Sequence, residues 1–201
     1  MKFVSKAVLA VALAVLAIPA FSQSTSDPNA PAPTIQQRKE NQQDRIGNGV
    51  QSGQLTAGET TNLEKKESAL NHEGRNMRKM DNGHLTAGDR ATINRQQNKL
   101  SNQIYNDKHN GRVQNTSPKS EVGKRQENQQ DRIANGVKSG QLTAGETARL
   151  EGRESNIHRE VKDDRAANGG KLTGQERRQV NRQQNRTSRA IYRDKHNGRK
   201  Q

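Results

Sequence analysis

Apolar side chains are sparse in this chain, and they recur at a spacing that places them on one face of an α-helix. Two long stretches carry clear stripes, and a shorter stretch before them carries an apolar edge that begins at Ile46. The stripes are Leu63, Leu70 and Met77 in residues 56–79, and Ile93, Leu100 and Ile104 in residues 86–109. We therefore predict three helices here, over residues 36–48, 56–79 and 86–109.

The same pattern occurs a second time. Residues 36–112 align without a gap with residues 123–199, and 44 of the 77 positions are identical. A self-match of this length indicates a tandem duplication. The sequence predicts an all-α protein with two copies of a three-helix, helical-hairpin unit, joined by a flexible linker over residues 113–122.

A short Leu-Thr motif precedes the predicted second and third helices of each copy. Its first occurrence is Leu55-Thr56-Ala57-Gly58-Glu59. A threonine at the N-cap and an acid three residues later form a capping box, in which each side chain bonds the other residue's backbone N–H. The predicted helix-capping pairs are Thr56 with Glu59, Thr86 with Asp89, Thr143 with Glu146, and Thr173 with Glu176.

Calcium is an alternative explanation of the same motif. If Leu55 takes position 8 of an EF-hand loop, the terminal acid takes position 12, which would make the unit an EF-hand-like helix-loop-helix pair. Val50 and Val137 would then stand at a ligand position, which opposes calcium, and the capping box explains the acid without a metal. The leading prediction is no cofactor. The alternative calcium ligands are Asn48, Ser52, Glu59, Asn135, Ser139 and Glu146.

The N-terminus has the layout of a secretory signal peptide. Lys2 and Lys6 precede an apolar run over residues 7–18, and the small residues Ala20 and Ser22 follow it. We predict a signal peptide over residues 1–22 and an exported chain, either periplasmic or extracellular. Three prolines make residues 23–35 a predicted flexible tether. The chain has no cysteine, which excludes disulfides and thiolate chemistry.

Charge adds a candidate binding surface. Residues 1–22 hold two lysines and no acid, so their removal lowers the net charge from +14 to +12. Arginines recur every three or four residues on the last predicted helix, and guanidinium groups pair well with phosphate and sulfate. An alternative is that they only solvate one helix face. The predicted polyanion-binding residues are Arg178, Arg182, Arg186, Arg189 and Arg193.

These arginines indicate an anionic polysaccharide, lipopolysaccharide or membrane surface as the partner. Sequence-specific nucleic acid binding is disfavoured, because Tyr105 and Tyr192 are the only aromatic residues after Phe21 and base stacking needs aromatic platforms. The small number of apolar side chains also leaves homo-oligomer formation open.

The Leu-Thr turns also resemble those of the periplasmic Spy/CpxP-type proteins, which are exported, basic and all-helical. The matching positions are Leu55/Thr56, Leu85/Thr86, Leu142/Thr143 and Leu172/Thr173. The resemblance implies a chaperone-like or stress-related role, in which unfolded envelope proteins are bound without ATP. This chain departs from that family by carrying an acid where the family carries Gln, and by its duplicated body.

Catalytic machinery is not visible in the sequence. Of the five histidines, only His109 and His196 occupy equivalent positions in the two copies, and no nucleophile–base set or phosphate-binding loop accompanies them. We predict a non-enzymatic exported helical binding module for anionic polymers, anionic surfaces or unfolded envelope proteins. The alternative is a degenerate EF-hand-like calcium-binding protein.

Overall fold

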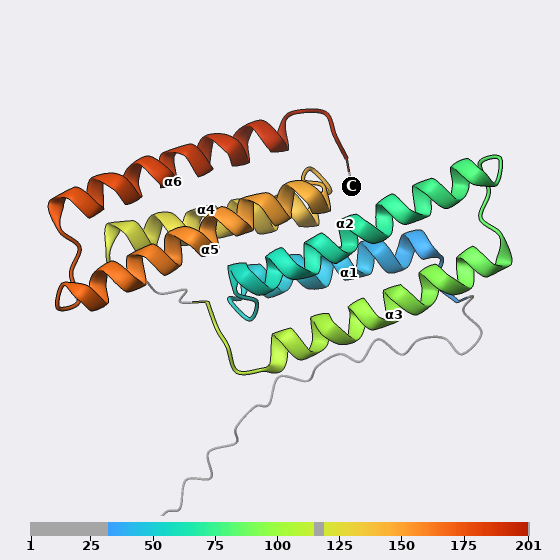
Figure 1. Ribbon diagram of the computed structural model, residues 1–201, viewed down its shortest axis with the longest axis horizontal. Coiled ribbons are helices and arrows are strands. Elements are labelled where there is room, and N and C mark those ends of the chain that lie inside the picture. Colours follow the sequence, from blue (N-terminus) through green and yellow to red (C-terminus); the bar gives the residue numbers. More distant parts are fainter. Residues whose placement is uncertain (1–31, 115–118, 201) are drawn as a thin grey trace, which may run out of the picture. The chain divides into compact units, whose positions relative to one another are not determined.

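The computed structural model describes residues 32–114 and 119–200 (Figure 1). Within these ranges the chain forms six α-helices and no strand, so the all-α prediction is confirmed. The helices are α1 (Ile35–Gln51), α2 (Ala57–Met80), α3 (Ala87–His109), α4 (Glu121–Lys138), α5 (Ala144–Ala167) and α6 (Gly174–Lys195). Among the described residues, no helix has the length and apolar character needed to cross a bilayer.

Several segment boundaries in the structure differ from the predicted ones. The predicted signal peptide over residues 1–22 and most of the predicted tether, residues 23–31, lie outside the described residues. Helix α1 begins at Ile35, the last residue of that tether, and α4 begins at Glu121, inside the predicted linker 113–122. Residues 115–118 of the linker also lie outside the described residues.

The end of α1 shows why one boundary was wrong. The sequence placed it near residue 48, before Gly49, but the helix continues to Gln51. Gly49 is needed for packing, because a Cβ there would lie 2.7 Å from Cδ1 of Leu55. The turn is made four residues later by Gly53, whose φ of 71° favours glycine.

Capping boxes start the helices. In each of the four predicted pairs, the threonine hydroxyl accepts from the backbone N–H of the acid, and the acid accepts from the threonine N–H. A fifth box, Thr34 with Gln37, starts α1 and has no Leu-Thr motif. Ser120 accepts from the Gly123 N–H at the start of α4, where glycine at the third helical position leaves the box half formed.

The capping acids of α2 and α5 have a further role. Oε1 of Glu59 accepts a 2.7 Å hydrogen bond from Asn110, and Arg112 lies 3.8 Å from the same oxygen. The second copy repeats this with Asn197 and Arg199 on Glu146. Each acid therefore joins the start of the middle helix to the end of the last one, which explains why the segment after α3 recurs after α6.

Buried glutamines hold the first and last helices of each copy together. Nε2 of Gln42 donates to the backbone oxygen of Gln97 at 2.7 Å, and Nε2 of Gln97 donates to that of Ile35 at 2.9 Å. Gln129 and Gln184 make the equivalent bonds in the second copy. The interior is therefore partly polar, and directional bonds add to a small apolar core.

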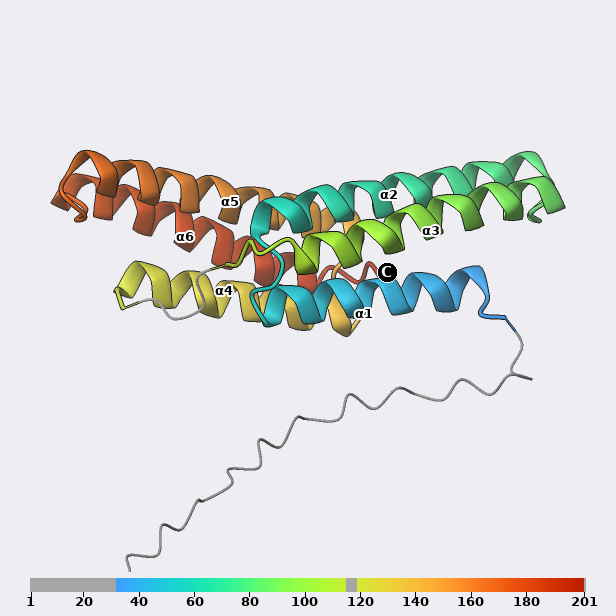
Figure 2. The ribbon, with the colours of Figure 1, turned by 90° about the horizontal axis from the view of Figure 1, so that it is seen from below.

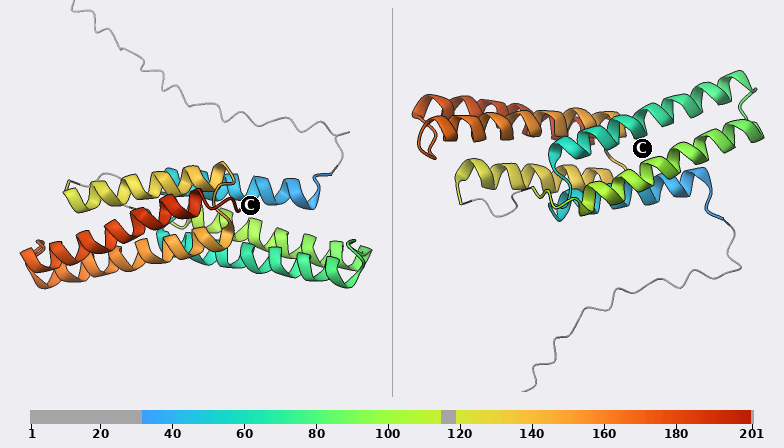
Figure 3. Two further views of the ribbon diagram at one scale, coloured as in Figure 1. Left: turned by 90° about the horizontal axis from the view of Figure 1, so that it is seen from above. Right: turned by 60° about the horizontal axis from the view of Figure 1, so that its bottom comes forward.

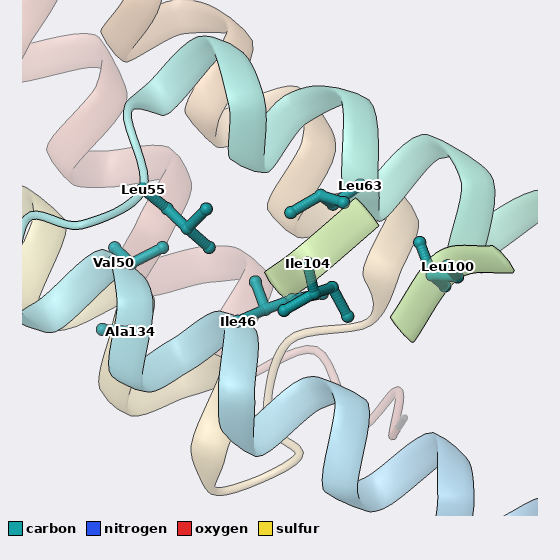
Figure 4. Close-up of a cluster of buried hydrophobic side chains, with 7 residues drawn as sticks. All are labelled: Ile46, Val50, Leu55, Leu63, Leu100, Ile104 and Ala134. Carbon is teal, nitrogen blue, oxygen red and sulfur yellow. The ribbon is translucent and has the colours of Figure 1, made fainter. Parts of the chain in front are cut away.

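The apolar core of the first copy includes a residue of the second. Figure 4 shows Ala134 of α4 beside Val50 of α1. The full cluster is Ile46, Val50, Leu55, Leu63, Leu100, Ile104 and Ala134. The second copy has its own clusters, around Ile133 and Ile191 and around Ile157 and Val180.

The two copies pack through equivalent helices. Helix α1 contacts α4, and α2 contacts α5, the most extensive helix pair in the structure (Figures 2 and 3). A Cβ added to Gly145 would lie 3.3 Å from Oγ of Ser68, and one added to Gly58 would lie 3.6 Å from Oγ of Ser155. Because Ser155 is the counterpart of Ser68, α2 and α5 run antiparallel about a local two-fold relation.

We expect Glu59→Ala to destabilise the protein more than Asp89→Ala. Glu59 is 8% exposed and loses both its cap and its bonds to the end of α3, whereas half-buried Asp89 loses a cap only. Losing a cap and a charged hydrogen bond together costs about 2 kcal/mol. Urea denaturation of the full chain measures both unfolding free energies. Equal losses of unfolding free energy in the two variants would show that the contact between Glu59 and Asn110 does not contribute to stability.

Candidate functional site

The candidate site begins with the five predicted arginines of α6, here called the α6 arginine stripe. All five are exposed, while Val180 and Ile191 on the same helix are buried. Of these five, only Arg193 forms a salt bridge with a described residue, Asp194, at 3.2 Å. The stripe is Arg178, Arg182, Arg186, Arg189 and Arg193.

The first copy lacks this stripe. The equivalent positions on α3 are Ala91, Arg95, Lys99, Asn102 and Asn106, only two of which are cationic. Residues 36–112 carry 13 basic and 9 acidic side chains, for a net charge of +4, whereas residues 123–199 carry 18 and 10, for +8. The two copies therefore share a helix frame and differ in the charge that the last helix exposes.

A cluster of buried carboxyls lies in the contact between α2 and α5. Its members, here called the carboxyl cluster, are Glu64, Glu67, Glu151 and Glu154, and each side chain is at most 1% exposed. Nε2 of Gln43 donates to Glu64 at 3.3 Å, and Nε2 of Gln130 donates to Glu151 at 2.9 Å. Among the described residues, neither oxygen of Glu154 has a hydrogen-bond partner.

Burial shifts the protonation of the whole cluster. It raises the pKa of Glu151 to about 8, and burial together with the neighbouring charge of Glu151 raises the pKa of Glu154 to about 8. Burial also raises the pKa of Glu64 well above the ordinary value of 4.5. At neutral pH the interior therefore favours neutral carboxyl groups, and each neutral group makes the molecule more positive.

The two halves of the cluster differ by one substitution. Burial raises the pKa of Glu67 to about 7, and the nearby ammonium of Lys39 works in the opposite direction. In the second copy Gln126 takes the place of Lys39, and its Nε2 is buried without a hydrogen-bond partner among the described residues. Glu154 therefore lacks the lysine that lies near Glu67 in the first copy.

The residues of the calcium alternative do not form an open loop. Asn48 and Asn135 lie inside helices α1 and α4, and Ser52 and Ser139 bond the backbone of those same helix ends. Oε2 of Glu59 accepts from Thr56 and its Oε1 from Asn110, so both carboxylate oxygens have protein partners. Glu146 has the equivalent partners, Thr143 and Asn197.

The two repeated histidines, His109 and His196, each pack against a tyrosine at the end of a helix. The ring of His109 stacks on Tyr105 with 4.2 Å between centroids, and its Nδ1 lies 2.6 Å from the Tyr105 backbone oxygen. His196 and Tyr192 repeat this at 4.3 Å. Within the described part of the chain, no three His, Asp or Glu side chains are placed to hold a metal ion.

No protein-family model, curated protein or solved structure matches this chain.

Sequence reasoning found the α6 arginine stripe and missed the carboxyl cluster. The hydrophobic pattern assigns Glu64 and Glu67 to solvent, because charged residues beside a leucine usually face water. One signal was available, since Gln42, Gln43, Glu64 and Glu67 are identical in both copies while their exposed neighbours Lys65 and Lys66 are not. The signal is weak, because the exposed residues Glu40, Asn41 and Asp44 are identical in both copies as well.

The carboxyl cluster predicts a protein that is less stable at alkaline than at mildly acidic pH. A carboxyl with a raised pKa keeps its proton in the folded state after the unfolded chain has released it. The unfolding free energy therefore falls as pH rises from about 4.5 to about 8, by about 1.4 kcal/mol per pH unit for each such group.

Replacing Glu151 and Glu154 by Gln should reduce this decline between pH 5.5 and 8 by about 2 kcal/mol or more. Chemical denaturation at several pH values measures it. Glu40→Gln, which changes an exposed glutamate of α1, is the control and should keep the wild-type slope. Parallel pH profiles for all three proteins would contradict a buried, protonated cluster.

Proposed function

We propose that this protein is a non-enzymatic, exported binding module for anionic polymers or surfaces. The single observation that carries the proposal is the α6 arginine stripe, in which Arg178, Arg182, Arg186 and Arg189 are exposed without a salt bridge to any described residue. Guanidinium groups at this spacing can pair with phosphate or sulfate groups along an extended chain. The signal-peptide pattern supports a partner outside the cytoplasm, such as an acidic polysaccharide or lipopolysaccharide.

The arrangement supports polyanions better than unfolded proteins. Binding of unfolded clients needs an apolar surface of some extent. The large exposed hydrophobic side chains in the described residues are Met80, Tyr105, Val113 and Tyr192, which lie on separate parts of the chain. The second copy by contrast presents five exposed arginines on one face of α6.

Heparin binding by the mature full chain tests the proposal. We expect affinity to fall steeply with salt, because each arginine that pairs with a sulfate releases a counterion. The triple variant Arg182→Gln, Arg186→Gln, Arg189→Gln should lower the slope of log K against log salt concentration by about 2 to 3. Isothermal titration calorimetry across a salt series measures it.

The first copy supplies the matched control. Arg95→Gln with Lys99→Gln removes the two exposed cations of α3 at equivalent positions, and it should leave most of the affinity and slope unchanged. Heparin binding that is absent, or that ignores salt, would refute the proposed function. Equal losses per removed charge, three in the stripe variant and two in the control, would show that net charge, and not the α6 arginine stripe, determines binding.

A further inference from the structure

A second basic surface lies where the two copies meet. The groove between α2 and α5, here called the α2–α5 groove, is an open surface hollow of about 560 Å³. Its cations are Lys65 from the first copy and Arg149, Arg153 and Arg159 from the second, and its lining contains no carboxylate. All four are exposed residues. The groove is therefore positive, and it requires both copies.

Small residues create the space for this groove. Gly58 and Thr61 of α2 line it together with Gly152 and Ser155 of α5. A Cβ added to Gly152 would lie 3.9 Å from Cγ2 of Thr61, an ordinary van der Waals distance, so these two small residues face each other across the groove. Because the side chains at the centre of the groove are short, the long cationic side chains surround a hollow that a compact oxyanion can enter.

The cations of the groove are largely uncompensated. Only Arg149 forms a salt bridge with a described residue, with Asp194 at 3.7 Å. Arg159 donates a 2.6 Å hydrogen bond to Asn156, which orients it at the rim. Like charges gathered in this way repel one another, and a multivalent anion bound among them would relieve that repulsion.

The α2–α5 groove is continuous with the α6 arginine stripe. Arg153 and Asn156 line it, and they also line a second hollow of about 400 Å³ between α5 and α6. Arg186 of the stripe lines that second hollow. Glu160 also lines that second hollow, where it accepts hydrogen bonds from Gln179 and Gln183. A path of cations therefore runs from α6 across α5 to Lys65 on α2, and it passes one carboxylate.

We propose that the α2–α5 groove is an anion subsite that takes a sulfate or phosphate group of the polymer held by the α6 arginine stripe. This inference rests on the proposed function and extends it, because it assigns the first copy a part in binding. One acidic chain crosses α5 and contacts both copies, so the duplication makes a longer binding site than either copy alone.

Lys65→Glu in the mature full chain is the decisive variant, because Lys65 is the one groove cation from the first copy and lies outside the stripe. Lys79→Glu is its matched control, with the same charge change on an exposed residue of the same helix. The two positions lie about 21 Å apart along the helix axis, which exceeds the screening length of about 8 Å at physiological ionic strength.

We expect Lys65→Glu to weaken binding of a heparin decasaccharide at least fivefold at 0.15 M salt, and Lys79→Glu to change it less than twofold. Inorganic tripolyphosphate is the phosphate probe, and its addition should shift the amide NMR signals of Thr61 and Gly152 in the wild type. Circular dichroism confirms that each variant is folded. A response to the decasaccharide alone would assign the subsite to sulfate, and a response to tripolyphosphate alone to phosphate.

Two failures are distinguishable. In the first case, the wild type binds heparin, the stripe variant loses binding, and Lys65→Glu has no more effect than Lys79→Glu. The anion subsite in the α2–α5 groove is then refuted, and the proposed function stands. If the wild type binds no heparin but tripolyphosphate still shifts Thr61 and Gly152, the proposed function fails and the anion subsite stands alone. If neither probe affects these signals, the groove binds no oxyanion.

Discussion

The close antiparallel contact between α2 and α5 is the constraint on which the rest of this structure depends. Glycines at positions 58 and 145 face serines of the opposite helix, and this lets two backbones approach where larger side chains would separate them. These two helices carry four buried glutamates, two of which accept hydrogen bonds from glutamines of α1 and α4. Burial of a carboxylate is costly, so these groups favour the neutral form, and glutamine amides satisfy part of their hydrogen-bonding capacity.

The helices α2 and α5 bury several of their acidic side chains and expose most of their basic ones. The carboxyl cluster places acids on the inner side of α2 and α5, while Lys65, Arg153 and Arg159 stand exposed on the same two helices. When a buried carboxyl is protonated, it no longer offsets the surrounding cations. The surface potential is then more positive than the formal charge of +14 implies, which favours the binding of anions.

The duplication shows which features the fold requires and which were free to change. The buried amide bonds of Gln42 and Gln97 recur as those of Gln129 and Gln184, because they join the first helix of a copy to its last. Exposed positions of the last helix diverged instead, so that Asn102 of α3 corresponds to Arg189 of α6. A shared frame with one altered face is consistent with a binding role for the second copy.

The sequence by itself determined the helices, the tandem copies and the capping pairs, because apolar spacing and capping chemistry are local properties of a few neighbouring residues. It also located the α6 arginine stripe, whose members share one helix face. Only the tertiary structure decided that Glu64 and Glu151 are buried, that Gly49 serves packing against Leu55, and that Lys65 and Arg153 line one groove. The burial of the glutamates and the lining of the groove depend on which helix lies opposite, and contacts between residues far apart in the sequence leave no periodic signal along the chain.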